Sequence, residues 1–87
     1  MKTLVTGAAG SIGSGLVDQI AKYFPEKIIM LDQAETPLYE LELRMKKQYS
    51  LNMSEIVIGD IRDEVRMRNM FKEFRPDFVY HAAAYKH

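Results

Sequence analysis

Cysteine and tryptophan are absent from this chain of 87 residues, and neither sign of charge is in excess. The lack of cysteine excludes disulfide bonds and thiolate chemistry and agrees with a cytoplasmic location, which we expect for this protein. Twelve basic and twelve acidic residues cancel, so the charge gives no indication of a nucleic-acid partner. No apolar run approaches the length of a membrane span, so we expect no membrane segment in this chain.

A glycine-rich stretch at residues 6–13, TGAAGSIG, is the clearest pattern that is present. It joins a short β-branched apolar segment to a segment with apolar residues at helical spacing. Such a turn brings backbone N–H groups close to a phosphate, and the helix N-terminus favours negative charge. Side chains at Gly7, Gly10 and Gly13 would obstruct the turn, the ligand's approach and the packing of helix on strand. The predicted cofactor contacts are Gly7, Ala9, Gly10, Ser11, Ile12 and Gly13.

The glycine spacing is G-x-x-G-x-x-G, because Ala8 stands where the commoner G-x-G-x-x-G motif needs glycine. A glycine pattern by itself is a weak signal, and a flexible structural turn is the alternative interpretation. The strand before it, the helix after it and an acidic residue further along favour dinucleotide binding over that alternative. The spacing found here is typical of extended short-chain dehydrogenase/reductases.

Strands and helices are expected to alternate along the rest of the chain. The expected strands are residues 2–6, 27–31, 55–58 and 78–81. Thr36, followed by Pro37 at the first helical position, is predicted to cap the second helix, and Asp63 the third. The predicted buried stripes are Ile12, Leu16, Ile20 and Phe24 in the first helix, Leu38, Leu41, Met45 and Tyr49 in the second, and Met67, Met70, Phe71 and Phe74 in the third.

Continuously apolar strands that alternate with helices predict an α/β protein with a parallel sheet. Right-handed crossovers give the sheet order 3-2-1-4 with three helices, which is the N-terminal part of a Rossmann fold. The first two helices then cover one face, while the other face has a single helix and the fourth strand has a bare edge. We therefore expect residues 1–87 to form an incomplete NAD(P)-binding domain of a longer protein, and to associate as a homo-oligomer.

Two aspartates end strands at the edge where open parallel sheets bind ligands. Asp32 follows the second strand, and its carboxylate can accept both adenosine-ribose hydroxyls and repel a ribose phosphate. NAD is therefore favoured over NADP, although a loop or helix cap is the alternative role. Asp60 follows the third strand and can accept a hydrogen bond from the adenine amino group. Capping of the turn before Asp63 is its rival role.

The closing segment HAAAYKH leaves the fourth strand at the same edge of the sheet. Its small alanines would let the cofactor's ribose and pyrophosphate lie against the backbone, or would pack tightly under the first helix. His81 is expected to be a satisfied edge histidine, and the charged pair at the end is either a substrate contact or simply solvated. The candidate contacts are Ala82, Ala83 and Ala84 for the cofactor and Lys86 and His87 for the substrate.

No catalytic residue can be assigned within this chain. Tyr23 and Lys27 have the Y-x-x-x-K spacing of the short-chain dehydrogenase/reductase catalytic pair. Pro25 breaks the helix that would present both side chains on one face, and Lys27 begins a strand at the opposite end of the sheet. The match is therefore a coincidence of spacing. Metal-ligand clusters and nucleophile–base pairs are also missing from the sequence, so we predict no metal site.

Four segments resemble the polysaccharide-biosynthesis (CapD-type) branch of extended short-chain dehydrogenase/reductases. They are VTGAAGSIGSGL, IIMLDQAETPLYELE, GDIRD and RPDFVYHAAAYKH. The resemblance implies a nucleotide-sugar 4,6-dehydratase that acts on UDP-N-acetylglucosamine-type substrates with bound NAD(P). It also implies adenine contacts from Asp60 and Ile61. Members of the family often have glutamate or another polar residue where Gly15 stands here.

In that family the sugar is oxidised at C4, water is eliminated across C5 and C6, and the hydride returns to C6. The family's catalytic residues lie beyond the position of His87, so the resemblance implies that the 87-residue chain alone is inactive. A nucleotide-sugar 4-epimerase is the near alternative, since it shares the glycine motif and GDIRD. A non-catalytic NAD(P)-binding sensor is an alternative from another class.

Overall fold

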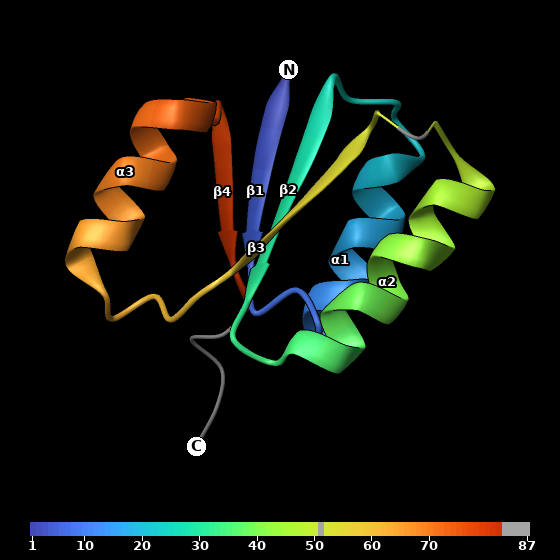
Figure 1. Ribbon diagram of the computed structural model, residues 1–87. Helices are drawn as coiled ribbons and strands as arrows, with labels where there is room; N and C mark the ends of the chain where they lie inside the picture. Colours follow the sequence, from blue (N-terminus) through green and yellow to red (C-terminus); the bar gives the residue numbers. More distant parts are fainter. Residues whose placement is uncertain (51, 83–87) are drawn as a thin grey trace.

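Strands and helices alternate without exception in the computed structural model, which describes residues 1–50 and 52–82 (Figure 1). The strands are β1 (Lys2–Thr6), β2 (Lys27–Asp32), β3 (Ser54–Ile58) and β4 (Phe78–His81), and the helices are α1 (Ser11–Ala21), α2 (Glu35–Gln48) and α3 (Glu64–Phe74). The strands expected from the sequence agree with these bounds to within one residue at each end. None of the helices in the described ranges is long and apolar enough to cross a membrane.

The four strands form one parallel sheet in the order β3-β2-β1-β4, as the sequence predicts. Val5 in β1 is aligned with Met30 in β2 and with Tyr80 in β4. The central strands β1 and β2 are apolar on both faces because helices pack against both faces of the sheet (Figure 1). The predicted α/β class and topology, the N-terminal part of a Rossmann fold, are confirmed.

Helices α1 and α2 pack side by side on one face of the sheet (Figure 1). The apolar core beneath them consists of Val5, Ala8, Val17, Ala21, Ile28, Met30, Leu38, Leu41, Met45 and Met53. The stripe predicted for α2 is confirmed, with Tyr49 only partly buried beyond the end of the helix.

The stripe predicted for α1 is wrong in part. Ile12 is 55% exposed and Phe24 is 73% exposed, and the buried residues of the helix are Gly13, Val17 and Ala21. These three residues recur one turn apart, so they share one helix face. Because the backbone of α1 must lie very close to the loop at Gly13, this small-residue face is turned toward the sheet. The larger Leu16 and Ile20 are half-buried and line a hollow beside β4, and Ile20 also packs against the edge of the core, as predicted.

Among the residues that the structure describes, α3 is the one helix on the other face of the sheet, as expected (Figure 1). Met70 is the buried residue of this helix, and Met67 and Phe74 pack partly against the core. Phe71 is 40% exposed, so its predicted place on the inner face is wrong. All four residues of β4 are exposed, which agrees with the bare edge that the topology predicts.

The two predicted helix caps have different outcomes. Asp63 caps α3, because its Oδ1 atom accepts a hydrogen bond from the Arg66 N–H at 3.1 Å. Thr36 does not cap α2, which begins at Glu35 after Ala34. The reason is the Oδ1 atom of Asp32, which accepts a hydrogen bond from the Ala34 N–H at 3.0 Å and so turns the chain into the helix earlier.

Candidate functional site

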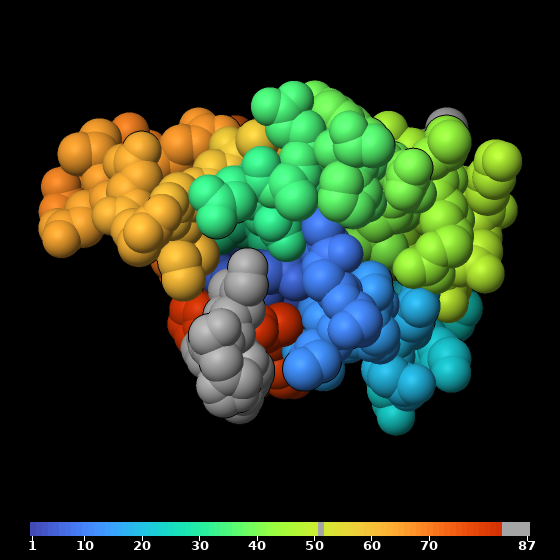
Figure 2. All heavy atoms as spheres, turned by 90° about the horizontal axis from the view of Figure 1, so that it is seen from below, coloured from blue at the N-terminus to red at the C-terminus, as the bar shows by residue number. Residues whose placement is uncertain are grey.

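Three segments of the chain meet at the carboxyl edge of the sheet, where open α/β sheets bind their ligands. They are the loop after β1, the end of β2 and the turn after β3. Figure 2 shows this edge, with the blue loop and first turn of α1 beside the green segment that follows β2. A small hollow of about 50 Å³ is lined by Gly7, Leu31, Asp32, Gln33, Gly59, Asp60 and Ile61.

The loop after β1 is shaped by two of its glycines. Gly7 has a left-handed φ of 67°, and the N–H of Gly10 donates to the Gly7 carbonyl at 3.2 Å. A Cβ at Gly13 would overlap the Gly7 carbonyl and lie 2.8 Å from Ala8 Cα. Gly7 is therefore needed for the turn and Gly13 for helix packing, as predicted. A Cβ at Gly10 would make only ordinary contact, 3.5 Å from the Gly7 oxygen, so its role in ligand approach stays a prediction.

The N-terminus of α1 has no side-chain cap at its Gly10 cap position. Gly10 stands at the cap position without a side-chain hydrogen bond, and the first turn contains no acidic residue. The first backbone hydrogen bond runs from the Ser14 N–H to the Gly10 carbonyl at 2.8 Å. Ser11 and Ile12 are both exposed. The first turn of this helix thus contributes no acid of its own to neutralise the positive helix end.

The Asp32 carboxylate joins the loop after β1 to the beginning of α2. Its Oδ2 atom accepts from the Ala9 N–H and its Oδ1 atom from the Ala34 N–H, each at 3.0 Å. The alternative role for Asp32, as a helix and loop cap, is therefore present in the fold. An ionised carboxylate has about four acceptor positions, so this role leaves one on each oxygen for a ligand hydroxyl.

Asp60 lies in the turn after β3, where Arg62 contacts both of its oxygens. Nη2 of Arg62 donates to Oδ2 at 2.7 Å, and the backbone N–H of Arg62 donates to Oδ1 at 2.9 Å. Hydrogen bonding from the Arg62 side chain, then from its backbone, lowers the pKa of Asp60 from 3.8 to about 2. The turn-capping role that rivals adenine binding is thus present, and contact with adenine stays a prediction.

The remaining predicted residues are placed as follows. Ile61 is 42% exposed beside Asp60, and Ala82 is 7% exposed just after β4. The Nδ1 atom of His81 lies 3.1 Å from Thr6 Oγ1 and shares a hydrogen bond with it, which confirms His81 as a satisfied edge histidine. Four predicted contacts lie outside the described residues: Ala83, Ala84, Lys86 and His87.

Tyr23 and Lys27, which match the spacing of the catalytic pair, do not form a catalytic arrangement in the structure. Tyr23 is 83% exposed beyond the end of α1, and Lys27 is the first residue of β2, at the amino edge of the sheet. Both residues are therefore remote from the candidate site. Within residues 1–50 and 52–82 there is also no cluster of three or more histidine, cysteine or acidic side chains that could hold a metal ion.

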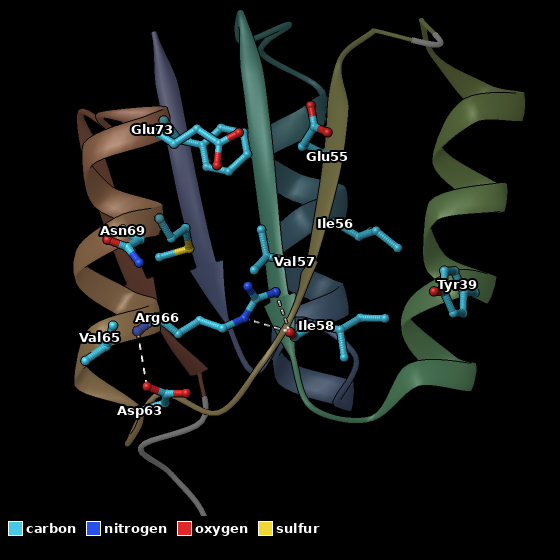
Figure 3. Close-up of a pocket in the computed structure, with 12 residues that line it drawn as sticks. Tyr39, Glu55, Ile56, Val57, Ile58, Asp63, Val65, Arg66, Asn69 and Glu73 are labelled. Carbon is cyan, nitrogen blue, oxygen red and sulfur yellow. Dashed lines mark hydrogen bonds between the residues drawn. The ribbon is translucent and has the colours of Figure 1, made fainter.

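Two arginines of the region were not predicted from the sequence. Arg66 reaches from α3 to the end of β3, where Nε and Nη2 donate to the Ile58 carbonyl at 3.1 and 2.7 Å (Figure 3). Arg62 contacts Asp60 through its backbone N–H. The sequence holds a signal for this contact, because an aspartate side chain commonly accepts a hydrogen bond from the backbone N–H two residues further on. The open hollow of about 690 Å³ in Figure 3 lies between α3 and β3, away from the loop after β1.

These features define a Rossmann-like fold, with a candidate ligand edge formed by β1, β2 and β3. The sequence matches the family described as "Polysaccharide biosynthesis protein" over residues 3–87, and the chain belongs to this family.

Individual relatives are consistent with that family. The chain is 42% identical to the capsular polysaccharide biosynthesis protein CapD of Staphylococcus aureus, over 97% of this chain and 14% of that protein. It is 35% identical to a UDP-N-acetylglucosamine 4,6-dehydratase (inverting) of Campylobacter jejuni, over 97% of this chain and 24% of that protein. The chain thus spans between 14% and 24% of the length of these relatives.

A solved structure has the same fold. It is the Bordetella bronchiseptica enzyme WbmG in complex with NAD, which superposes with a TM-score of 0.75 at 24% sequence identity. The superposition covers 94% of this chain and 24% of WbmG.

Gly13→Ala is expected to destabilise the fold by about 1–3 kcal/mol, because its Cβ would overlap backbone that cannot move aside. Gly15→Ala is the matched change in the same helix, where a Cβ meets nothing within 4 Å. It is expected to stabilise the fold by about 0.5–1 kcal/mol, since alanine favours a helix over glycine. Urea unfolding followed by circular dichroism measures both. Equal effects of the two substitutions would contradict the close contact at Gly13.

Proposed function

We propose that this chain is the NAD-binding part of a nucleotide-sugar 4,6-dehydratase of polysaccharide biosynthesis, acting on a UDP-N-acetylhexosamine-type substrate. The observation that carries the proposal is the Asp32 carboxylate at the end of β2, bonded to the Ala9 N–H of the loop after β1. With this arrangement, the carboxylate proposed to accept the ribose hydroxyls lies next to the loop proposed to bind phosphate. The dehydratase of C. jejuni and the NAD complex of WbmG, two proteins similar to this chain, support it.

Each part of the adenosine half of the cofactor has a matching group. The pyrophosphate would lie against the loop from Gly7 to Gly13 and the open N-terminus of α1. The ribose hydroxyls would bind the remaining acceptor positions of Asp32, and adenine would lie near Asp60 and Ile61. The negative charge of Asp32 opposes a 2′-phosphate, which favours NAD over NADP. Ala82, Ala83 and Ala84 remain predicted contacts to the ribose and pyrophosphate.

The chemistry expected of the whole protein is an internal redox cycle, in which the bound nicotinamide takes a hydride from sugar C4 and returns it to C6 after water is lost. The residues described here would bind and orient the cofactor. We assign none of them as a catalytic acid or base, so we propose that the 87-residue chain alone does not turn over substrate. A 4-epimerase or a non-catalytic sensor would use the same half-site.

Asp32→Asn is expected to weaken NAD binding roughly tenfold, because hydrogen bonds from the ribose to a charged acceptor are lost. The preference for NAD over NADP should also fall, since the charge that opposes the 2′-phosphate is removed. Calorimetric titration of the chain with each dinucleotide measures both effects. The amide oxygen of asparagine still accepts one backbone hydrogen bond, and circular dichroism checks that the variant is folded.

Glu40→Gln is the matched control, because Glu40 is exposed on α2 and the substitution removes the same charge away from the site. It should bind NAD as the parent chain does. Unchanged NAD affinity in Asp32→Asn, or NADP bound as tightly as NAD by the parent chain, would contradict the proposed ribose contact.

The proposed reaction is tested on a protein that carries this chain within a full catalytic domain. Incubation with UDP-N-acetylglucosamine is expected to give a product that is lighter by one water and carries a ketone at C4, as seen by mass spectrometry and NMR. A product of unchanged mass with inverted C4 would instead identify an epimerase. NAD binding with unaltered substrate would favour the sensor.

Self-association is the partner interaction that we propose for the 87-residue chain itself. Its support is the exposed strand β4, in which Phe78, Val79 and Tyr80 are 49%, 36% and 43% exposed. An unpaired apolar edge strand is a template for pairing with another chain.

Val79→Lys is expected to shift the chain to a monomer in sedimentation velocity, at concentrations where the parent chain associates. Val65→Lys, on an exposed apolar residue of α3, should leave association unchanged.

A further inference from the structure

The peptide unit between Ile58 and Gly59 is hydrogen-bonded at both of its polar ends. Its N–H donates to the Asp32 carbonyl at 3.1 Å, which ties the end of β3 to the end of β2. A trans peptide points its N–H and its C=O in opposite directions, so the Ile58 carbonyl is directed away from β2. The Nε and Nη2 atoms of Arg66 donate to this carbonyl at 3.1 and 2.7 Å, each through a hydrogen of its own. A carbonyl oxygen accepts two hydrogen bonds, so both can form at once.

The Arg66 side chain also lies directly against Gly59. A Cβ at Gly59 would be 2.9 Å from the Nε atom and 3.4 Å from the Cδ atom of Arg66, so alanine would push the arginine aside. Glycine makes this close contact possible, but it also leaves the backbone more conformational freedom than any other residue does. Arg66 therefore supplies a restraint on the turn after β3 that the glycine itself does not provide.

The restrained peptide leads directly into the candidate site. Gly59, Asp60 and Ile61 line the hollow of about 50 Å³ together with Asp32. Arg66 lines the larger hollow between α3 and β3 instead (Figure 3). Its backbone N–H is bonded in the first turn of α3 by the cap described above, so the helix determines where the guanidinium begins. The turn is thus held by β2 on one side and by α3 on the other.

We propose that Arg66 is a positioning residue for the adenine side of the nucleotide site. The inference rests on the proposed NAD-binding function. By holding the Ile58–Gly59 peptide, Arg66 keeps the turn at Asp60 and Ile61 in place beside Asp32, so that the base and the ribose bind at the same time. A turn that is already ordered does not have to be ordered by the ligand, which favours binding. Arg66 therefore increases the affinity for the base without touching it.

The test compares AMP with ribose 5-phosphate, which lacks the base. The dissociation constant of ribose 5-phosphate divided by that of AMP measures what the base contributes. In Arg66→Ala this ratio is expected to fall by roughly threefold to tenfold, the effect of about one hydrogen bond. Amide NMR signals of the loop after β1 and the turn after β3 report binding even when it is weak. The lost positive charge affects both phosphates equally, so it cancels in the ratio.

Three further variants separate positioning from other effects. Arg66→Lys keeps the charge and one donor, so its ratio is expected to lie between those of the parent chain and Arg66→Ala. Arg68→Ala removes the same charge from an exposed position on α3, and its ratio should match that of the parent chain. Gly59→Ala displaces the arginine and should lower the ratio in the parent chain, but lower it little further when combined with Arg66→Ala.

Circular dichroism checks that each variant is folded, and Arg66→Met, which keeps an unbranched side chain without donors, takes the place of Arg66→Ala if the alanine variant does not fold. If the parent chain binds NAD but the ratio in the variant is unchanged, the positioning role is refuted while nucleotide binding stands. The same conclusion follows if the parent chain binds AMP no better than ribose 5-phosphate. If the folded parent chain does not bind NAD, the proposed function fails, and the inference fails with it.

Discussion

The close approach of α1 to the loop after β1, at Gly13, is the constraint on which the rest of the structure depends. No side chain fits there, because a Cβ would overlap the Gly7 carbonyl. The contact fixes how α1 is rotated, so that Val17 and Ala21 face the sheet and Leu16 and Ile20 face β4. It also fixes where the helix begins, and hence which N–H groups point to the ligand edge. Packing and the candidate site therefore share one cause.

Asp32 extends this arrangement to the second strand. Its carboxylate binds the Ala9 N–H of the loop and the Ala34 N–H before α2, so one side chain links β1, β2 and both helices of that face. The Gly59 N–H donates to the Asp32 carbonyl at 3.1 Å, which brings the turn after β3 to the same place. A residue proposed to bind ribose thus also holds the loop proposed to bind phosphate. Ligand binding and loop shape are coupled through a single carboxylate.

The sequence predicts the topology well, because apolar periodicity, crossover handedness and turn residues all indicate the same sheet order. It fails where tertiary contacts override local pattern. Ile12 is exposed because the contact at Gly13 turns Val17 and Ala21 toward the sheet, and Phe24 is exposed because α1 ends at Ala21. Thr36 is a good cap by residue type, but Asp32 begins α2 earlier. The contact of the Arg62 guanidinium with both oxygens of Asp60 depends on side-chain geometry that sequence spacing alone does not specify. The position of Asp32, by contrast, could be predicted from the sequence, because the prediction required only the point at which an apolar strand ends.

The described residues supply groups that we propose for recognition of the cofactor, and none that we assign to the chemical step. The groups proposed to bind adenosine lie on β1, β2 and β3, whose backbone is held by the sheet and, at its end, by Arg66 on Ile58. All four residues of the strand β4 are exposed, and we assign none of them a part in binding or catalysis. Recognition of the adenosine half needs fixed donors and acceptors, which a buried strand end supplies. The proposed half-site would serve a dehydratase or an epimerase equally well, because it would contribute binding and orientation, while the choice of reaction would depend on groups placed around the sugar.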